Sequence, residues 1–201
     1  MLTTLSLVGL MLASLASILL LFRGTKESID SSAEIKVARL SILSFILAVI
    51  GEFTLTSNSM DSDTLARMLS NLALYAGAPL LVSSILAKAL DRNFTMQTWG
   101  RYLLAIIALF ELCRRMEVGE NYGYALGIIL VASLFVAALI TQNKTMRLSL
   151  SISAITLGLA FAGYLMQTEQ SIVYICLMVA VWFGARALNS IRSVIKKQMT
   201  G

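Results

Sequence analysis

A group of three charged residues in the second half of a largely apolar segment is the first sign of chemistry in this chain. Glu111, Arg114 and Arg115 lie in the segment 99–118, at intervals of three and four residues. In a helix these intervals place the three side chains on one side, in the glutamate-before-arginine order that favours an ion pair. A charge at the centre of a membrane span costs about 2.5–3.5 kcal/mol, so such a group calls for a function or a route to the membrane surface.

Two explanations of this charged group stay open. In the first, the arginines extend to the outer lipid headgroups and Glu111 neutralises one of them. In the second, the group is a polar site open to the outer side, where the arginines bind an anionic lipid or a small anionic ligand and the carboxylate exchanges a proton. Glu52, near the outer end of the segment 37–56, is expected at the same level and joins the site if the two helices touch.

A second set of candidates lies near the middle of two other segments. Pro79 has no N–H and pushes away the carbonyl of Tyr75, four residues earlier, which then needs a partner in the bundle, a water or a ligand. Trp182 is expected at a similar depth, either on a substrate path or as core packing, and Arg186 either extends inward or pairs with an interior group. The candidate substrate or ion path therefore comprises Glu52, Tyr75, Pro79, Glu111, Arg114, Arg115, Trp182 and Arg186.

The composition indicates whether these residues lie in a water-soluble protein or in a membrane. The 201 residues are 58% hydrophobic and 13% charged, with a mean hydropathy of +0.82. Soluble domains carry about 25% charged residues. A single proline and long uninterrupted apolar runs favour helices over a β-barrel. The sequence thus predicts an all-α polytopic membrane protein, one transmembrane domain over residues 1–201, with the lipid bilayer as its surroundings.

Seven segments are long enough to cross the ~30 Å hydrocarbon core. Thirteen of the sixteen lysines and arginines fall on one side in this count, which leaves Arg67, Arg114 and Arg115 on the other. The positive-inside rule then places the N-terminus outside and the C-terminus in the cytoplasm, in a bacterial inner (plasma) membrane. The predicted spans are about 3–22, 37–56, 65–90, 99–118, 122–140, 147–166 and 171–195.

A weak internal similarity suggests two halves. Arg39-Leu-Ser corresponds to Arg147-Leu-Ser, and Tyr75-Ala-Gly-Ala to Trp182-Phe-Gly-Ala, at offsets of 108 and 107 residues. This is the hypothesis of a 3+1+3 parallel repeat, an arrangement found in transporters. In topology alone the layout resembles the SWEET sugar transporters and the microbial rhodopsins. It has neither the prolines of the former in both halves nor the seventh-helix lysine of the latter, so we assign no family.

Several functions are disfavoured by what the sequence lacks. Histidine is absent, which removes histidine-dependent metal sites and Ser-His or Cys-His catalytic pairs. Cys113 and Cys176 are isolated and read as inert thiols. The net charge of +5 follows from basic inner segments, so it does not indicate nucleic acid. We expect no cofactor, no metal, no nucleic-acid partner and no enzymatic activity.

Three functions stay open. The first is a small-molecule or ion transporter or channel with a polar site near the outer half of the segment 99–118. The second is an accessory, assembly or sensory subunit, because small-residue stripes such as Gly123 and Gly127 allow close helix approach within the chain, in a homo-oligomer or with a membrane partner. The third is an intramembrane enzyme acting on lipids. A polar cavity that reaches Glu111, Arg114 or Tyr75 would favour transport.

Overall fold

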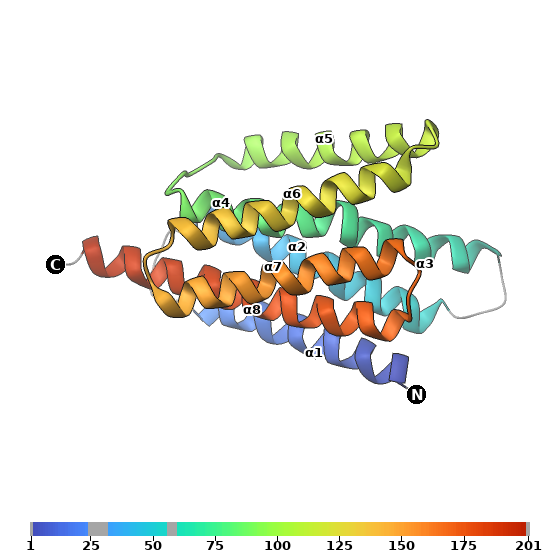
Figure 1. The fold of residues 1–201 in the computed structure, drawn as a ribbon, viewed down its shortest axis with the longest axis horizontal. Helices are drawn as coiled ribbons and strands as arrows, with labels where there is room; N and C mark the ends of the chain where they lie inside the picture. Colours follow the sequence, from blue (N-terminus) through green and yellow to red (C-terminus); the bar gives the residue numbers. More distant parts are fainter. Residues whose placement is uncertain (1, 24–31, 56–59, 200–201) are drawn as a thin grey trace.

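The computed structural model describes residues 2–23, 32–55 and 60–199, the last nine of these by backbone alone. This part of the chain is a bundle of antiparallel helices whose two ends carry the two termini (Figure 1). The elements are α1 (Leu2–Arg23), α2 (Ala33–Thr54), α3 (Met60–Leu72), η1 (Ala73–Gly77), α4 (Ala78–Ala89), α5 (Met96–Arg115), α6 (Gly119–Ile140), α7 (Lys144–Leu165) and α8 (Gln170–Met199).

In the described part of the chain, α3, η1 and α4 run on as one rod, so seven rods result. Five stretches are long and apolar enough to cross a membrane, and the expectation of a helical membrane protein is thereby supported. Neither α2 nor α5 is among them, so the seven-span count and its orientation stay predictions. The five stretches are Leu2–Phe22, Met60–Ala89, Gly119–Ile140, Lys144–Leu165 and Gln170–Ser190.

Most helices begin several residues before the apolar run that predicted them. The helix expected from residue 99 begins at Met96, because the Thr95 side chain accepts a hydrogen bond from the N–H of Thr98 at 3.3 Å. In the same way, Asn143 caps α7 by accepting the N–H of Thr145 at 3.0 Å. Polar caps stand outside the hydrophobic stretch, so hydropathy alone places helix starts too late.

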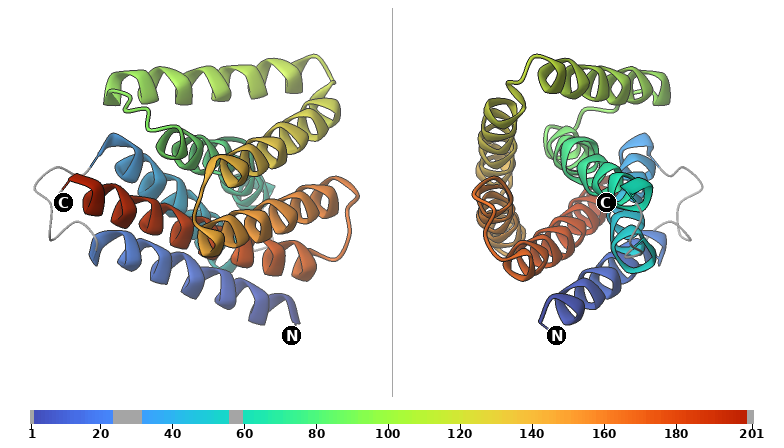
Figure 2. Two further views of the ribbon diagram at one scale, coloured as in Figure 1. Left: turned by 60° about the vertical axis from the view of Figure 1, so that its left-hand side comes forward. Right: turned by 90° about the vertical axis from the view of Figure 1, so that its right-hand side faces the viewer.

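Six of the rods form a closed ring. Its contacts run from α1 to α2, α4, α6, α7, α8 and back to α1, and α8 also contacts α2 and α4. Figure 2 shows this arrangement from the end of the bundle, with α5 outside the ring. The backbone of α5 lies closest to α6 and η1, the Tyr102 hydroxyl bonds to Ser83 of α4 at 2.6 Å, and the buried side chains of α5 are Trp99 and Ile106. The segment 99–118, which is the single segment between the two halves of the predicted 3+1+3 repeat, therefore lies at the edge of the bundle.

Small residues let the ring helices approach closely, as their spacing predicts. A Cβ on Gly127 would stand 3.2 Å from the Phe161 side chain of α7, and one on Gly158 would stand 3.0 Å from Val131 of α6. On the opposite side, a Cβ on Gly9 of α1 would meet Met178 of α8 at 3.0 Å. Apolar side chains gain nothing from leaving lipid for other apolar side chains, so such close packing holds membrane helices together.

Pro79 is accommodated by a change of helix type. The five residues of η1 form a π-helical turn that ends two residues before it, and the N–H of Ala78 bonds to the carbonyl of Ala73, five residues back. The carbonyl of Gly77 accepts a hydrogen bond from Ser41 Oγ of α2. A proline removes one N–H from the helical ladder, and a π-turn takes up the mismatch. The break expected at Tyr75 is thus a wide, buried turn supported by α2.

The loop before α5 is held by a buried carboxylate. Glu34 of α2 is fully buried, and its Oε1 accepts the backbone N–H of Phe94 at 2.9 Å. Its Oε2 has no hydrogen-bond partner among the described residues. The segment 23–36 reads from sequence as a polar loop, so the sequence did not mark Glu34 as a structural residue.

Candidate functional site

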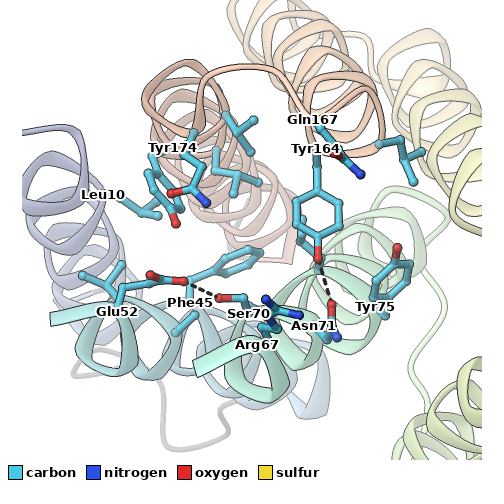
Figure 3. A pocket seen from close by; sticks show the side chains of 18 of the residues that line it. Leu10, Phe45, Glu52, Arg67, Ser70, Asn71, Tyr75, Tyr164, Gln167 and Tyr174 are labelled. Carbon is cyan, nitrogen blue, oxygen red and sulfur yellow. Dashed lines mark hydrogen bonds between the residues drawn. The ribbon is translucent and has the colours of Figure 1, made fainter. Parts of the chain in front are cut away.

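A cavity of about 700 Å³ opens at the end of the bundle where α2 ends and α3 begins (Figure 3). Each of the seven rods contributes at least one residue to its wall. The floor is apolar and includes Leu7, Leu10, Phe45, Val49, Leu74 and Leu177. The upper wall and mouth are polar and include Glu52, Arg67, Ser70, Asn71, Tyr75, Tyr164, Gln167, Thr168 and Tyr174. An apolar pocket with a few convergent polar groups is the usual form of a small-molecule site.

Glu52 brings a carboxylate into this cavity. It is half-buried near the end of α2, and its Oε1 accepts a hydrogen bond of 3.2 Å from Ser70 Oγ of α3. Figure 3 shows both side chains on the cavity wall, with Tyr174 of α8 on the same side. Within the described residues, Glu52 forms no ion pair. The negative charge of this carboxylate is therefore stabilised by one hydroxyl group and by any molecule that occupies the cavity.

A hydrogen bond crosses the mouth between distant parts of the chain. Tyr164 Oη of α7 donates to Asn71 Oδ1 of α3 at 2.9 Å, a bond that Figure 3 shows spanning the opening. Gln167, on the same rim, stands directly after α7 with a positive φ of 52°. The N–H of Gln167 bonds to the carbonyl of Tyr164 at 3.3 Å and the N–H of Thr168 to that of Gly163 at 3.0 Å. This helix-ending motif fixes the α7–α8 turn at the edge of the cavity.

Four aromatic rings form a cluster beside the cavity. The ring of Tyr75 stacks on that of Phe110 at 4.4 Å and lies 6.0 Å from Tyr122 and 6.5 Å, edge-on, from Tyr164. These residues belong to η1, α5, α6 and α7 respectively. A Cβ on Gly123 would stand 3.2 Å from Tyr75 Oη, so this glycine makes room for the phenol. The cluster joins α5 to the ring and holds Tyr75 on the cavity wall.

The charged group on α5 is a compact ion pair at the surface. Arg114 donates from Nε to Glu111 Oε2 at 2.9 Å and from Nη2 to Oε1 at 2.8 Å, and Arg115 Nε donates to Oε1 at 3.0 Å. The arginine side chains are 61% and 75% exposed. Arg114 lines the cavity, whereas Glu111 and Arg115 do not. The three side chains lie on one side of the helix, as predicted, and Glu111 forms ion pairs with both arginines.

The remaining candidates lie away from the cavity. Pro79 is fully buried in α4, Trp182 is half-buried on α8, and Arg186 is exposed on the same helix. None of the three lines the cavity. The hydrogen-bond partner of Glu52 is Ser70 and not an arginine of α5. Of the eight predicted residues, the structure brings Glu52, Tyr75 and Arg114 to the cavity.

Sequence reasoning missed most of the polar wall. Arg67, Ser70 and Asn71 stand at positions i, i+3 and i+4 of α3, a spacing that places them on one side of a helix. That spacing could have predicted a polar side on this helix. Tyr164 and Tyr174 lie near helix ends, where tyrosine ordinarily indicates the membrane interface, so no local signal separated them from interfacial aromatics.

Charge is distributed unevenly between the two ends of the bundle. The cavity end carries three arginines, Arg67, Arg114 and Arg115, and seven carboxylates: Glu52, Asp61, Asp63, Glu111, Glu117, Glu120 and Glu169. The surroundings of the mouth are thus net negative. Among the described residues, no group of three or more carboxylate, cysteine or histidine side chains could hold a metal ion, and both cysteines are free thiols.

Comparison with protein-family models, with curated proteins and with solved structures found no match. The long apolar helices make the chain a helical integral membrane protein, and the cavity is its candidate functional site.

Proposed function

We propose that this protein transports a small solute across a bacterial inner membrane, with the cavity as its outward-facing binding site and the C-terminus in the cytoplasm. One observation carries the proposal: a cavity of about 700 Å³, polar at the mouth and apolar at the floor, to which all seven rods contribute. Small-molecule sites occupy about 300–1,000 Å³. A bundle that acts only as a scaffold has no need of such a volume among its helices.

The helix interruption beside the cavity supplies a means of movement. The π-turn η1 ends two residues before Pro79, and Tyr75 within that turn lines the cavity. Interrupted helices near substrate depth are a recurring feature of transporters. In the proposed cycle, bending at η1 opens the inner half of the bundle, while α3 and α7, which the bond between Asn71 and Tyr164 already joins, move together over the mouth.

The ring suits two related halves. A 3+1+3 repeat would pair α1 with α6, α2 with α7, and the rod of α3 and α4 with α8. If a two-fold axis relates such halves, the contact between α4 and α6 in one position corresponds to the contact between α8 and α1 in the other. Both contacts occur. Rocking of one half against the other is the motion such repeats perform. We propose passage of the solute without chemical conversion.

Transport is tested with protein reconstituted in liposomes. The probes are radiolabelled choline, benzoate and ribitol, an organic cation, an organic anion and a neutral polyol. We expect at least one probe to enter faster than into protein-free liposomes. In a background with both cysteines replaced by alanine, modification of Ser70→Cys in the cavity should block that flux. Modification of the exposed Thr64→Cys, on the same helix but off the cavity wall, should leave it unchanged.

The alternative function predicts a different result. An accessory subunit is favoured by the few buried side chains of α5 and by exposed apolar residues such as Leu104 and Leu112, which offer a surface to a partner helix. If no probe enters faster than into empty liposomes and modification at Ser70→Cys changes nothing, transport is refuted in favour of that role.

A further inference from the structure

We propose that the cavity selects an organic cation, an ammonium group carried on an apolar or aromatic body. The inference rests on the proposed function only in taking the cavity as the solute site. It replaces the anionic ligand expected from the arginines of α5, because these arginines already have an ion-pair partner.

The arginines of α5 are not free to bind an anion. Glu111 holds Arg114 through two hydrogen bonds of 2.8 and 2.9 Å and accepts a third, of 3.0 Å, from Arg115. An anionic ligand would have to compete with a carboxylate already in bidentate geometry. Arg67 is the other cation on the wall, and it is exposed at the mouth, where water solvates it.

Two carboxylates on the cavity wall have no ion-pair partner among the described residues, the exposed Glu120 and the half-buried Glu52, and Glu52 is the one partly removed from water. It is half-buried, and within the described residues its partner is the neutral hydroxyl of Ser70. Taking a carboxylate out of water is costly unless an opposite charge accompanies it. A bound cation would supply that charge. The net negative mouth would also draw cations toward the cavity.

Tyrosine rings provide the second element of an ammonium site. Tyr75, Tyr164 and Tyr174 line the same cavity, and Figure 3 shows them around its wall together with Glu52. The Tyr75 ring stacks on Phe110, but its contact with Tyr164 is edge-on at an angle of 72°, so the two tyrosine rings form a corner. Cations are attracted to the faces of aromatic rings, and cages of such rings recognise quaternary ammonium groups.

The floor indicates that the cation is organic. Leu10, Phe45 and Leu177 lie at the bottom of the cavity and offer no oxygen ligand from their side chains. A hydrated inorganic cation would gain nothing from that surface, whereas the body of an organic cation would bury apolar area against it.

Binding is measured by calorimetry on the full chain in lipid nanodiscs, separately from transport. The probes are benzyltrimethylammonium, phenylacetate and sodium ion. We expect saturable binding of benzyltrimethylammonium and none of the other two. Glu52→Gln should weaken that binding at least tenfold, whereas Glu117→Gln, the same change at the same end but off the cavity wall, should alter it less than twofold. Tyr174→Leu should weaken it severalfold, and Tyr174→Phe, which keeps the ring, should not.

The outcomes separate this inference from the proposed function. Binding of phenylacetate, or equal binding of benzyltrimethylammonium by wild type and Glu52→Gln of unchanged thermal stability, overturns the choice of a cation. The transport proposal survives that result if modification at Ser70→Cys still blocks flux. Cation binding without any flux supports the ligand class and refutes transport.

Discussion

Replacing Gly77 tests how α2 supports the π-helical turn. A Cβ at this position would overlap Ser44 Oγ of α2, while its next contacts, the Ser41 carbonyl oxygen at 3.4 Å and Ser44 Cβ at 3.5 Å, are ordinary. The obstacle is therefore one hydroxyl group, which donates a hydrogen bond of 2.7 Å to the Ser41 carbonyl. Gly77→Ala must displace that hydroxyl or push the two helices apart.

The expected cost follows from these contacts. Overpacking a well-packed interior costs about 1–3 kcal/mol, and a lost hydrogen bond about 0.5–1.5 kcal/mol. We expect Gly77→Ala to lower the free energy of unfolding by about 1–3 kcal/mol. In a Ser44→Ala background the nearest remaining atoms are the Ser41 carbonyl oxygen at 3.4 Å and the residue 44 Cβ at 3.5 Å, so the same change should cost less than about 0.5 kcal/mol. The coupling between the two positions should thus be at least about 0.5 kcal/mol.

The assay is unfolding by SDS titration in mixed micelles, followed by circular dichroism, for the wild type, both single variants and the double variant. Gly100→Ala is the matched control, because a Cβ there meets nothing within 4 Å. It should be neutral or stabilising by up to about 1 kcal/mol from helix propensity. An equal cost of Gly77→Ala in both backgrounds would refute the reasoning, since it would show that the Ser44 hydroxyl is not what the new methyl group meets.

Three further predictions follow from single contacts. Glu34→Ala leaves the Phe94 N–H without its acceptor and should lower the free energy of unfolding by about 1–3 kcal/mol in the same titration. Glu34→Gln keeps an acceptor oxygen and should cost less than about 1 kcal/mol, so equal costs of the two variants would contradict this prediction. Glu117→Gly should raise stability by about 0.5–1 kcal/mol, because the residue has φ 59°, and a decrease would count against strain there. Tyr164→Phe removes the donor to Asn71 and should speed thiol modification of Ser70→Cys by about two- to tenfold, with an unchanged rate showing that this bond does not restrict the mouth.

Local features were predictable because they depend on residues close in the chain. Composition and long apolar runs indicate membrane helices, and spacing of three and four residues places Glu111, Arg114 and Arg115 on one side of a helix. The small-residue stripes predict close helix packing for the same reason. Pro79 predicts an irregularity in its helix, although the choice of a π-turn depended on the fit against Ser41 of α2.

The cavity itself was decided by the tertiary structure. Glu52, Asn71, Tyr164 and Tyr174 come from four helices, and nothing in their local sequence says that these helix ends converge. Hydropathy does not separate a lipid-facing side from a core-facing side, because both are apolar in a membrane protein. The predicted repeat gave the segment 99–118 a central place, whereas the packing puts α5 at the edge of the bundle. Sequence alone thus determined that polar groups cluster at the ends of apolar helices, and only the packing of the ring decided which of them face one another.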